Sequence, residues 1–374
     1  MALKVGIVGM GGIGNLHGEC YQKDSLAELC AVCDVEKDKA DAGGEKFNVP
    51  VFYTAKEMLA AMPELDVVAI TTSGYENGSW HYVPAMEALA AGKHVLCEKP
   101  ISNDVIEARE MVRFAAEKDL YLGCNLNHYF AEPSFAADKL IAEGKIGSPV
   151  YIMQKMGFDG SSATFGGKMS PRWQKPYSHV KAFLAHPFSL MRHFGGDITH
   201  VQAFFDRPGV RKTADDMMYS INSVNLRFEN GSVGYILSQR GDARFGLGGW
   251  WSLEMAGING TFCIEGCVEK LTYWSGPKPS DDPFNPMAAG GAMPEPEVTK
   301  WEGAAFNETF PIRLHAFLED ITNGVPKDHL RASGRDALAT LEYTFAAIKS
   351  FEEGGAVVRP EALPNLHGDV KYIW

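Results

Sequence analysis

A short β-branched run at residues 4–9 ends in Gly9, and Gly11 and Gly14 follow it in the spacing G-x-G-x-x-G. A helical stretch comes next, and in that context the spacing indicates a dinucleotide-binding βαβ unit. The first glycine allows a tight turn, the second lets the backbone approach a pyrophosphate, and the third lets the helix pack closely on the strand. The helix N-terminus offers unpaired N–H groups and a positive dipole end to the phosphates. The residues expected to contact the cofactor here are Gly9, Gly11, Gly12, Ile13 and Gly14.

An acidic residue at the end of the next predicted strand indicates which dinucleotide is bound. Asp34 closes the run LAELCAVCD, roughly 20 residues after the last glycine of the motif. A carboxylate at this place accepts hydrogen bonds from the adenosine ribose hydroxyls and repels a 2′-phosphate. The sequence therefore predicts NAD rather than NADP, with an ordinary glycine turn and a surface aspartate as the alternative.

Further strand-like runs alternate with helical stretches and predict a parallel sheet. The runs lie at residues 67–72, 94–99 and 120–126. Such alternation is typical of a doubly wound α/β fold, so we expect a Rossmann domain over residues 1–126. In such sheets, ligands lie beyond the carboxyl ends of the strands. The residues expected to border the cofactor at this edge are Thr71, Thr72, Ser73, His81, Glu98, Lys99, Asn125 and Asn127.

The second half of the chain has longer strand-like runs joined by tight turns. LRFENGSVGYIL is the clearest hairpin, because Asn230-Gly231 supplies the positive φ angles of a two-residue turn, and Asn259-Gly260 repeats the pattern. An amphipathic helix closes this region. We predict an α+β domain over residues 127–374 with an open, largely antiparallel sheet. Residues 275–303 are expected to form a long loop, over the active site, in a subunit contact, or as an ordinary excursion.

Composition excludes several classes of protein. Hydrophobic residues make up 45% of the chain and charged residues 22%, without an apolar stretch that could span a membrane. The N-terminal sequence lacks the pattern of a secretory signal, so a soluble, cytoplasmic protein is expected. The net charge of −12 argues against nucleic acid as a partner, because binding of a phosphate backbone needs a basic face.

The seven cysteines predict neither a disulfide framework nor a metal site. Cys30 and Cys33 spell C-x-x-C within a strand-like run, where residues three apart face opposite sides. Two core cysteines are therefore favoured over a redox pair. His, Cys and carboxylate residues show no recognisable metal-ligand spacing, so no metal is expected.

A second motif, AGKHVLCEKP, ends in Glu98-Lys99-Pro100. Together with the glycine fingerprint it resembles the strand-end signature of the Gfo/Idh/MocA oxidoreductases, and the resemblance extends over nearly the whole chain. It implies that Lys99 reaches both the nicotinamide ribose side and a substrate hydroxyl, and that the peptide before Pro100 helps to set its geometry. From the residues alone, a lysine at a hydrophobic strand end is costly to bury without partners, and a surface lysine is the alternative.

The same resemblance draws attention to residues 178–197. The family usually has an aspartate there, a histidine four residues later and a second aspartate three residues after the histidine. Of these three, this chain has only the histidine, His186; Ala182 and Ser189 occupy the positions of the two aspartates. His186 precedes Pro187, which suits the first turn of a helix, where the dipole favours a neutral imidazole that can accept a proton. We expect His186 to act as the base, with a purely structural histidine as the alternative.

The chemistry of side chains indicates which residues would contact a sugar-like substrate. Aromatic rings stack on the apolar faces of sugars, and amides bind hydroxyls. Many relatives carry an arginine where this chain has Tyr129. His179 or Lys181 is expected to compensate for the missing aspartates. The residues expected on the sugar face are Asn127, His128, Tyr129 and Trp173.

These features lead to one expected reaction and two rivals. The expected reaction is hydride transfer between a secondary hydroxyl of a sugar or glycoside and the nicotinamide of NAD, with His186 taking the proton and Lys99 stabilising the alkoxide. The region around His186 resembles glycoside dehydrogenases acting at C3, which implies a 3-keto product. The rivals are a glycoside hydrolase that transiently oxidises C3, and a nucleotide- or sugar-sensing protein on the same fold. The resemblance also implies a homo-oligomer joined through the exposed face of the second sheet.

Overall fold

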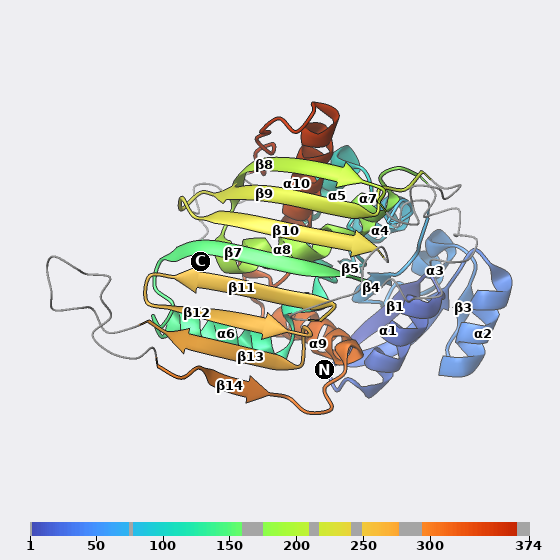
Figure 1. Cartoon of the computed structure of the whole chain (residues 1–374). Coiled ribbons are helices and arrows are strands. Elements are labelled where there is room, and N and C mark those ends of the chain that lie inside the picture. Colours follow the sequence, from blue (N-terminus) through green and yellow to red (C-terminus); the bar gives the residue numbers. More distant parts are fainter. Residues whose placement is uncertain are drawn as a thin grey trace, which may run out of the picture.

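The computed structural model describes residues 2–74, 78–158, 175–208, 217–240, 249–276 and 294–364. Two sheets organise the molecule, one in each half, with helices between them (Figure 1). Within those ranges, no helix has the length and apolarity needed to cross a membrane.

The first half is the predicted Rossmann domain. Its six-stranded sheet has the order β3-β2-β1-β4-β5-β6, and every pairing is parallel. This doubly wound order places the switch point between β1 and β4, where such sheets bind ligands. The strands are β1 (Leu3–Val8), β2 (Ala27–Cys33), β3 (Val51–Phe52), β4 (Val67–Ile70), β5 (His94–Cys97) and β6 (Leu122–Cys124). The helices that connect them are α1 (Gly12–Lys23), α2 (Lys37–Phe47), α3 (Ala55–Ala61), α4 (Tyr82–Ala90) and α5 (Val105–Glu117).

The central strands are apolar on both sides because helices cover both faces of the sheet. All four residues of β4 (Val67–Ile70) are buried, as a continuous apolar run predicts for a parallel strand. One covering helix comes from the far end of the chain: Leu314 and Phe317 of α9 (Thr309–Thr322) pack in the same core as Val5 and Ile7 of β1. The first domain is therefore completed by residues from the C-terminal half.

The second half is built on an eight-stranded sheet with the order β14-β13-β12-β11-β7-β10-β9-β8. Only the β7–β10 pairing is parallel among the described strands, so the sheet is largely antiparallel, as predicted. Its strands are β7 (Pro149–Phe158), β8 (Ile198–Asp206), β9 (Ile221–Phe228), β10 (Val233–Arg240), β11 (Trp251–Gly257), β12 (Gly260–Glu265), β13 (Lys270–Ser275) and β14 (Glu297–Lys300). Part of the range expected to be a loop, residues 297–300, is thus a strand, whereas residues 277–293 lie outside the description.

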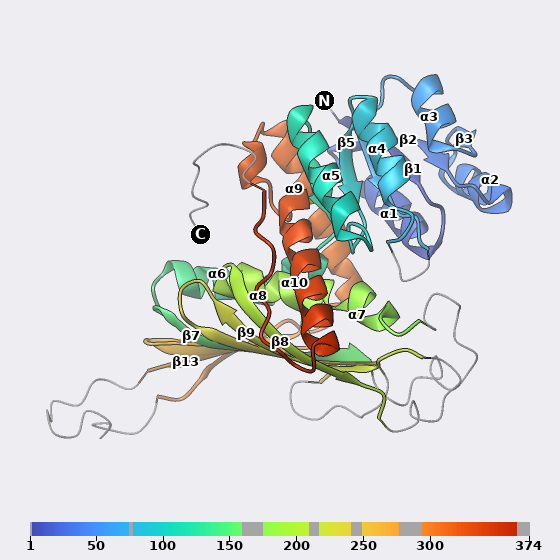
Figure 2. The same ribbon diagram turned by 90° about the horizontal axis from the view of Figure 1, so that it is seen from above.

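The described helices of the second half lie on one face of this sheet, and none of them lies on the other face, which we call the open face (Figure 2). Besides α9, the described helices of the second half are α6 (Glu132–Ala142), α7 (Ser178–Phe183), α8 (Ala185–Gly195) and α10 (Gly334–Glu352), with the short 3-10 helices η1 (Asn127–Tyr129), η5 (Phe306–Glu308) and η6 (Lys327–His329). The predicted closing helix is α10, followed by Gly354 and Gly355, both at positive φ. It packs against α5 and β6 of the first domain and against α8 and β8 of the second.

Both predicted hairpins form, but their turns differ from the expectation. Four residues separate β9 from β10, and only Gly231 of the Asn-Gly pair has a positive φ, of 90°. The side chain of Asn230 instead accepts a hydrogen bond from the backbone N–H of Ser232 at 3.0 Å. At the second hairpin neither Asn259 nor Gly260 has a positive φ. The first loop is therefore longer than the predicted two residues. The second has two residues, Ile258 and Asn259, but not the predicted pair or its positive φ angles, because the pairing of the flanking strands sets where each turn begins.

Candidate active site

The glycine turn after β1 has the geometry that its spacing predicts. Gly9 has a φ of 107°, and a Cβ there would lie 2.5 Å from the backbone nitrogen of Thr72. A Cβ on Gly14 would lie 1.8 Å from the carbonyl oxygen of Gly9. By contrast, nothing lies within 4 Å of a Cβ built on Gly11 or Gly12. The fold itself thus requires the first and third glycines, while the second leaves the start of α1 open to a phosphate group.

Asp34 is fixed beside this turn. Its Oδ2 accepts a hydrogen bond from the backbone N–H of Met10 at 2.6 Å, and its Oδ1 accepts one from Glu36 at 2.9 Å. A carboxylate has about four lone-pair sites, so both oxygens can still accept hydrogen bonds from ribose hydroxyls. These residues fit NAD: an open helix N-terminus for the pyrophosphate lies next to an oriented carboxylate for the ribose.

The segment after β4 is tied to the turns on either side of it. The hydroxyl of Thr71 donates to the Gly9 carbonyl at 2.6 Å. The two ring nitrogens of His81 lie 2.7 Å from the carbonyl oxygen of Thr72 and 2.8 Å from that of Pro100. His81 therefore holds the segment after β4 against the segment after β5. Ser73 is exposed at this edge, as is Ile13 at the start of α1.

Glu98, at the end of β5, is a buried anchor. Its Oε1 accepts hydrogen bonds from His17 Nε2 at 2.9 Å and from Asn125 Nδ2 at 2.6 Å, and its Oε2 accepts one from the Lys99 N–H at 3.1 Å. Burial alone would raise the pKa of Glu98, but the hydrogen bond and charge of His17, then Lys99 and Asn125, bring it below the usual value. The carboxylate is thus ionised and joins α1, β5 and β6. His17 was missed in the sequence, although it follows Gly14 on the face of α1 that meets the sheet.

Lys99 follows directly and precedes Pro100 across a cis peptide bond. Burial lowers the pKa of Lys99, partly offset by the nearby Glu98 carboxylate. The positive charge of Lys99 in turn lowers the pKa of two imidazoles from the second domain, those of His128 and His186. Lys99 is thus close enough to His128 and His186 for its charge to act on both rings, although they belong to different domains.

The two imidazoles lie against each other. The ring centres of His128, on η1, and His186, in the first turn of α8, are 3.9 Å apart with an interplanar angle of 27°. Burial, followed by the charge of Lys99, lowers the pKa of His128 to about 3. Burial also lowers the pKa of His186 well below its usual value, with smaller effects from His128 and Lys99. Both rings are therefore neutral at neutral pH.

The other residues proposed around His186 face in different directions. Ser189 and Ala182 stand where the family usually has aspartates. The Ser189 hydroxyl donates a hydrogen bond to the carbonyl of His186 at 2.7 Å, and Ala182 is buried. His179 is buried with its Nε2 at 3.1 Å from the Ser238 hydroxyl. The Lys181 ammonium lies 5.4 Å from the ring centre of a phenylalanine on α10.

The proposed sugar-face residues on η1 also diverge. Asn127 donates from Nδ2 to the Thr309 hydroxyl at 2.7 Å. Tyr129 stacks on His193 with ring centres 4.4 Å apart, beside a cavity behind the site. His128 is the member of this group that meets His186. Trp173 lies outside the described residues.

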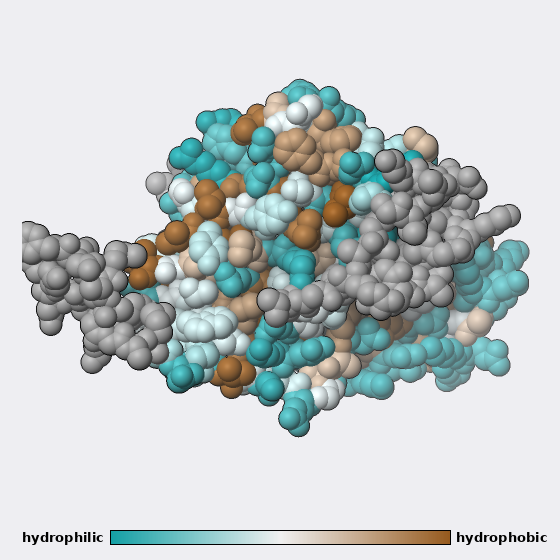
Figure 3. Space-filling view, in the orientation of Figure 1, coloured by the Kyte–Doolittle hydropathy of each residue, from teal (hydrophilic) through white to brown (hydrophobic). Residues whose placement is uncertain are grey.

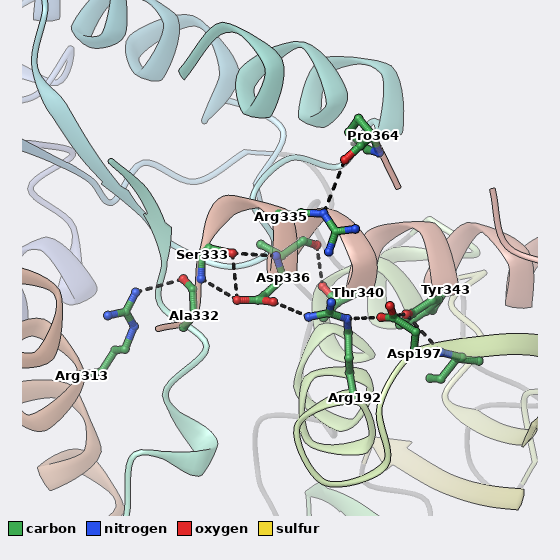
Figure 4. A network of polar contacts seen from close by, with 12 residues as sticks. Arg192, Asp197, Arg313, Ala332, Ser333, Arg335, Asp336, Thr340, Tyr343 and Pro364 are labelled. Atoms are coloured by element: carbon green, nitrogen blue, oxygen red, sulfur yellow. Dashed lines mark hydrogen bonds and ion pairs between the residues drawn. The ribbon is translucent and has the colours of Figure 1, made fainter. Parts of the chain in front are cut away.

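Behind His186, a polar network fastens α8 to α10 (Figure 4). Arg192 of α8 donates from Nε to Asp197 at 2.7 Å and pairs with Asp336 of α10. Asp336 in turn completes a capping box with Ser333 at the start of α10. Ala332, next to Ser333, accepts hydrogen bonds from the N–H of the last residue of β6 at 2.9 Å and from Arg313 of α9 at 3.1 Å. The helix that carries His186 is therefore held at a fixed place relative to the end of β6.

The fold and this site define an oxidoreductase that binds a dinucleotide on its first domain and brings side chains of its second domain to the cofactor edge. Residues 3–126 match the family model described as oxidoreductase family, NAD-binding Rossmann fold, and residues 135–262 match the GFO/IDH/MocA C-terminal domain. The chain belongs to the Gfo/Idh/MocA family of oxidoreductases. It is an enzyme, and its cofactor is NAD.

Named relatives fall within the same group of dehydrogenases. The myo-inositol 2-dehydrogenase of Thermotoga maritima is 23% identical over 376 residues, which cover 96% of this chain and 100% of that protein. The D-glucoside 3-dehydrogenase of Escherichia coli is 32% identical over 152 residues, 40% of this chain and 42% of that protein. Levoglucosan dehydrogenase, solved in complex with NADH, shares the fold with a TM-score of 0.79 at 19% identity, covering 97% of this chain and 100% of that one.

Among the described residues, no three His, Cys, Asp or Glu side chains are grouped so that they could hold a metal ion.

Proposed function

We propose that this chain is an NAD-dependent dehydrogenase that oxidises a secondary hydroxyl of a sugar or glycoside, at C3. The observation that carries the proposal is the stacked, buried pair of His128 and His186 from the second domain, which lies within reach of the charge of Lys99 at the end of β5. A cation and an unprotonated base beside a cofactor are the two groups that alcohol oxidation needs. The named sugar, polyol and glucoside dehydrogenases among the relatives support the substrate class.

When bound, NAD supplies the hydride acceptor. His186 accepts the proton of the substrate hydroxyl, which it can do because its lowered pKa keeps the ring unprotonated at neutral pH. The negative charge that develops on the substrate oxygen raises the proton affinity of the imidazole at the moment of transfer. The Lys99 ammonium stabilises the same charge in a partly desolvated site, where its effect is stronger than in water.

C3 is proposed as the carbon that is oxidised. Two observations support it: the region around His186 resembles glycoside 3-dehydrogenases, and a D-glucoside 3-dehydrogenase is among the relatives. The ketone at C3 would acidify the neighbouring C–H bond, so the product suits a second enzyme that eliminates the aglycone.

The test is a substrate panel followed by absorbance at 340 nm. We expect NADH to accumulate with aryl glucosides or free hexoses, and the product to be the 3-keto compound by NMR. His186→Gln is expected to lower kcat about 10²-fold, since general bases contribute at least that much. The matched control is His200→Gln, which changes a histidine on the β8 strand. Free sugar released without NADH would favour the hydrolase, and NAD binding without turnover of any compound would favour a sensor.

We also propose that two copies of the chain associate through the open face of the eight-stranded sheet (Figure 3). Met153 of β7 and Val233 of β10 are 44% and 53% exposed on this face, and Tyr235 of β10 pairs in register with Met153. A water-exposed apolar strip across paired strands is a frequent site of protein association. Sedimentation equilibrium is expected to give a multiple of the 40.9 kDa chain mass, and Met153→Glu to reduce it. A wild-type protein that sediments as a monomer would contradict the proposed association.

A further inference from the structure

We propose that Trp251 fixes the proton of His128 on Nε2, so that His128 donates a hydrogen bond to a substrate oxygen beside the proton-accepting His186. The donor role rests on the proposed function, whereas the position of the proton on the ring does not. Trp251 is thus a positioning residue for His128, and neither residue's role follows from the sequence motifs.

The chemistry of the Trp251–His128 contact decides which nitrogen is protonated. The indole Nε1 of Trp251 lies 3.1 Å from Nδ1 of His128. An indole N–H can only donate, so Nδ1 must offer its lone pair. The ring is neutral, because burial and the charge of Lys99 lower the pKa of His128 to about 3. A neutral imidazole has one N–H, and it is therefore on Nε2.

The surroundings keep the two partners in this arrangement. Trp251 is fully buried at the start of β11, where it pairs with Met156 of β7. His128 is 3% exposed, with His186 stacked on its ring and the edge-on ring of Phe306 at 5.0 Å. A flip of the His128 ring would place the Cδ2–H, which cannot accept, against the buried indole N–H, and a proton on Nδ1 would place two donors against each other. The bond from Trp251 therefore selects one tautomer and one ring orientation.

The Nε2 atoms of the two stacked rings are available to a ligand. No described residue hydrogen-bonds Nε2 of His128 or Nε2 of His186, and neither atom is among the fully buried polar atoms, whereas Nδ1 of His186 is fully buried. The pair therefore offers one fixed donor beside one ring that is free to accept, next to the ammonium of Lys99. Two neighbouring groups of opposite hydrogen-bonding character fit a substrate that presents adjacent hydroxyls. The fixed donor would hold one oxygen while the other loses its proton.

The position of the proton is read by NMR of the apo protein with ¹⁵N-labelled histidine. The His128 signals are assigned by their absence in His128→Asn. In the wild type we expect the shift pattern of an imidazole protonated on Nε2. In Trp251→Phe we expect the Nδ1-protonated form to appear in a substantial fraction. The matched control is Trp250→Phe, which removes the neighbouring indole, whose ring centre is 6.5 Å from that of His128 and which makes no hydrogen bond to it.

Activity tests the donor role separately. With a substrate that the wild type oxidises, Trp251→Phe is expected to lower kcat about tenfold with KM changed less, while Trp250→Phe stays within twofold of the wild type. A wild-type His128 protonated on Nδ1 would overturn the proposal, and this measurement needs no variant of Trp251. A tautomer that changes in Trp251→Phe without any change in kcat would overturn the donor role. If no substrate is turned over at all, the proposed function fails while the NMR result still stands on its own.

Discussion

Lys99→Met is expected to lower kcat for the sugar substrate about 10³-fold, the upper range for removal of one group that stabilises an oxyanion. Methionine keeps the length and apolar stem of the side chain but not the charge. NAD affinity, measured by calorimetry, should change less than kcat, because the pyrophosphate and the adenosine ribose are expected to lie against the glycine turn and Asp34, and Lys99 only beside the nicotinamide ribose. The substitution is therefore expected to lower kcat much more than NAD affinity.

The pH profile gives a second readout for Lys99. The ammonium is the active form, and burial lowers the pKa of Lys99 from 10.5. Activity should accordingly fall on the alkaline side at a pH below 10.5, and that limb should disappear from the residual activity of Lys99→Met. Lys93→Met is the matched control, because Lys93 precedes the opposite end of β5 and donates to the Pro63 carbonyl. Equal kcat in the two variants would rule out the proposed role.

Gly14→Ala is expected to destabilise the protein and to abolish NAD binding. Its Cβ would lie 1.8 Å from the carbonyl oxygen of Gly9, and a backbone atom cannot move aside as a flexible side chain can. Forcing α1 away from the β1 turn should cost about 3 kcal/mol, the upper part of the usual range for overpacking. For a domain of this size, that corresponds to a fall in Tm of roughly 10 °C.

Gly12→Ala is the matched control for that experiment. The same methyl group two residues earlier meets nothing within 4 Å, and alanine favours a helix over glycine by up to about 1 kcal/mol. Its Tm, measured by calorimetry without NAD, should equal or exceed that of the wild type. Similar Tm values for the two variants would show that close packing of α1 on the turn is not what Gly14 provides.

Local patterns were enough to predict the first domain. The glycine spacing and the strand-like apolar runs depend on neighbouring residues, so the parallel sheet and its turn geometry could be read without knowing any long-range contact. The hairpins of the second domain were also predicted, but not their turns. Whether Asn230 or Gly231 takes a positive φ depends on how far β9 and β10 pair. The four residues between these strands do not determine the extent of that pairing.

The site was only partly predictable because its decisive contacts join distant residues. Lys99 and His186 were identified through family motifs, and the charge of Lys99 reaches His186 across the two domains. The Glu98–His17 and His128–Trp251 hydrogen bonds join residues that are 81 and 123 positions apart. No motif or spacing in the sequence predicts either bond. Similarly, His128 and Tyr129 are neighbours on one helical turn, yet His128 stacks on His186 while Tyr129 stacks on His193 and lines a cavity, a difference set by the packing of η1 between α8 and α9.

The position of α10 also bears on how the protein is made. This helix (Gly334–Glu352) contacts both domains, and α9, which completes the core of the first sheet, is also encoded late in the chain. A ribosome therefore releases the whole NAD-binding sequence long before the helices that cover it exist. Until then, Val5 and Ile7 of β1 have α1 beside them but lack Leu314 and Phe317 of α9, and incompletely covered apolar surface of this kind promotes misassembly. The first domain therefore reaches its final packing only when α9 and α10 have been synthesised, and the two halves complete their folding together.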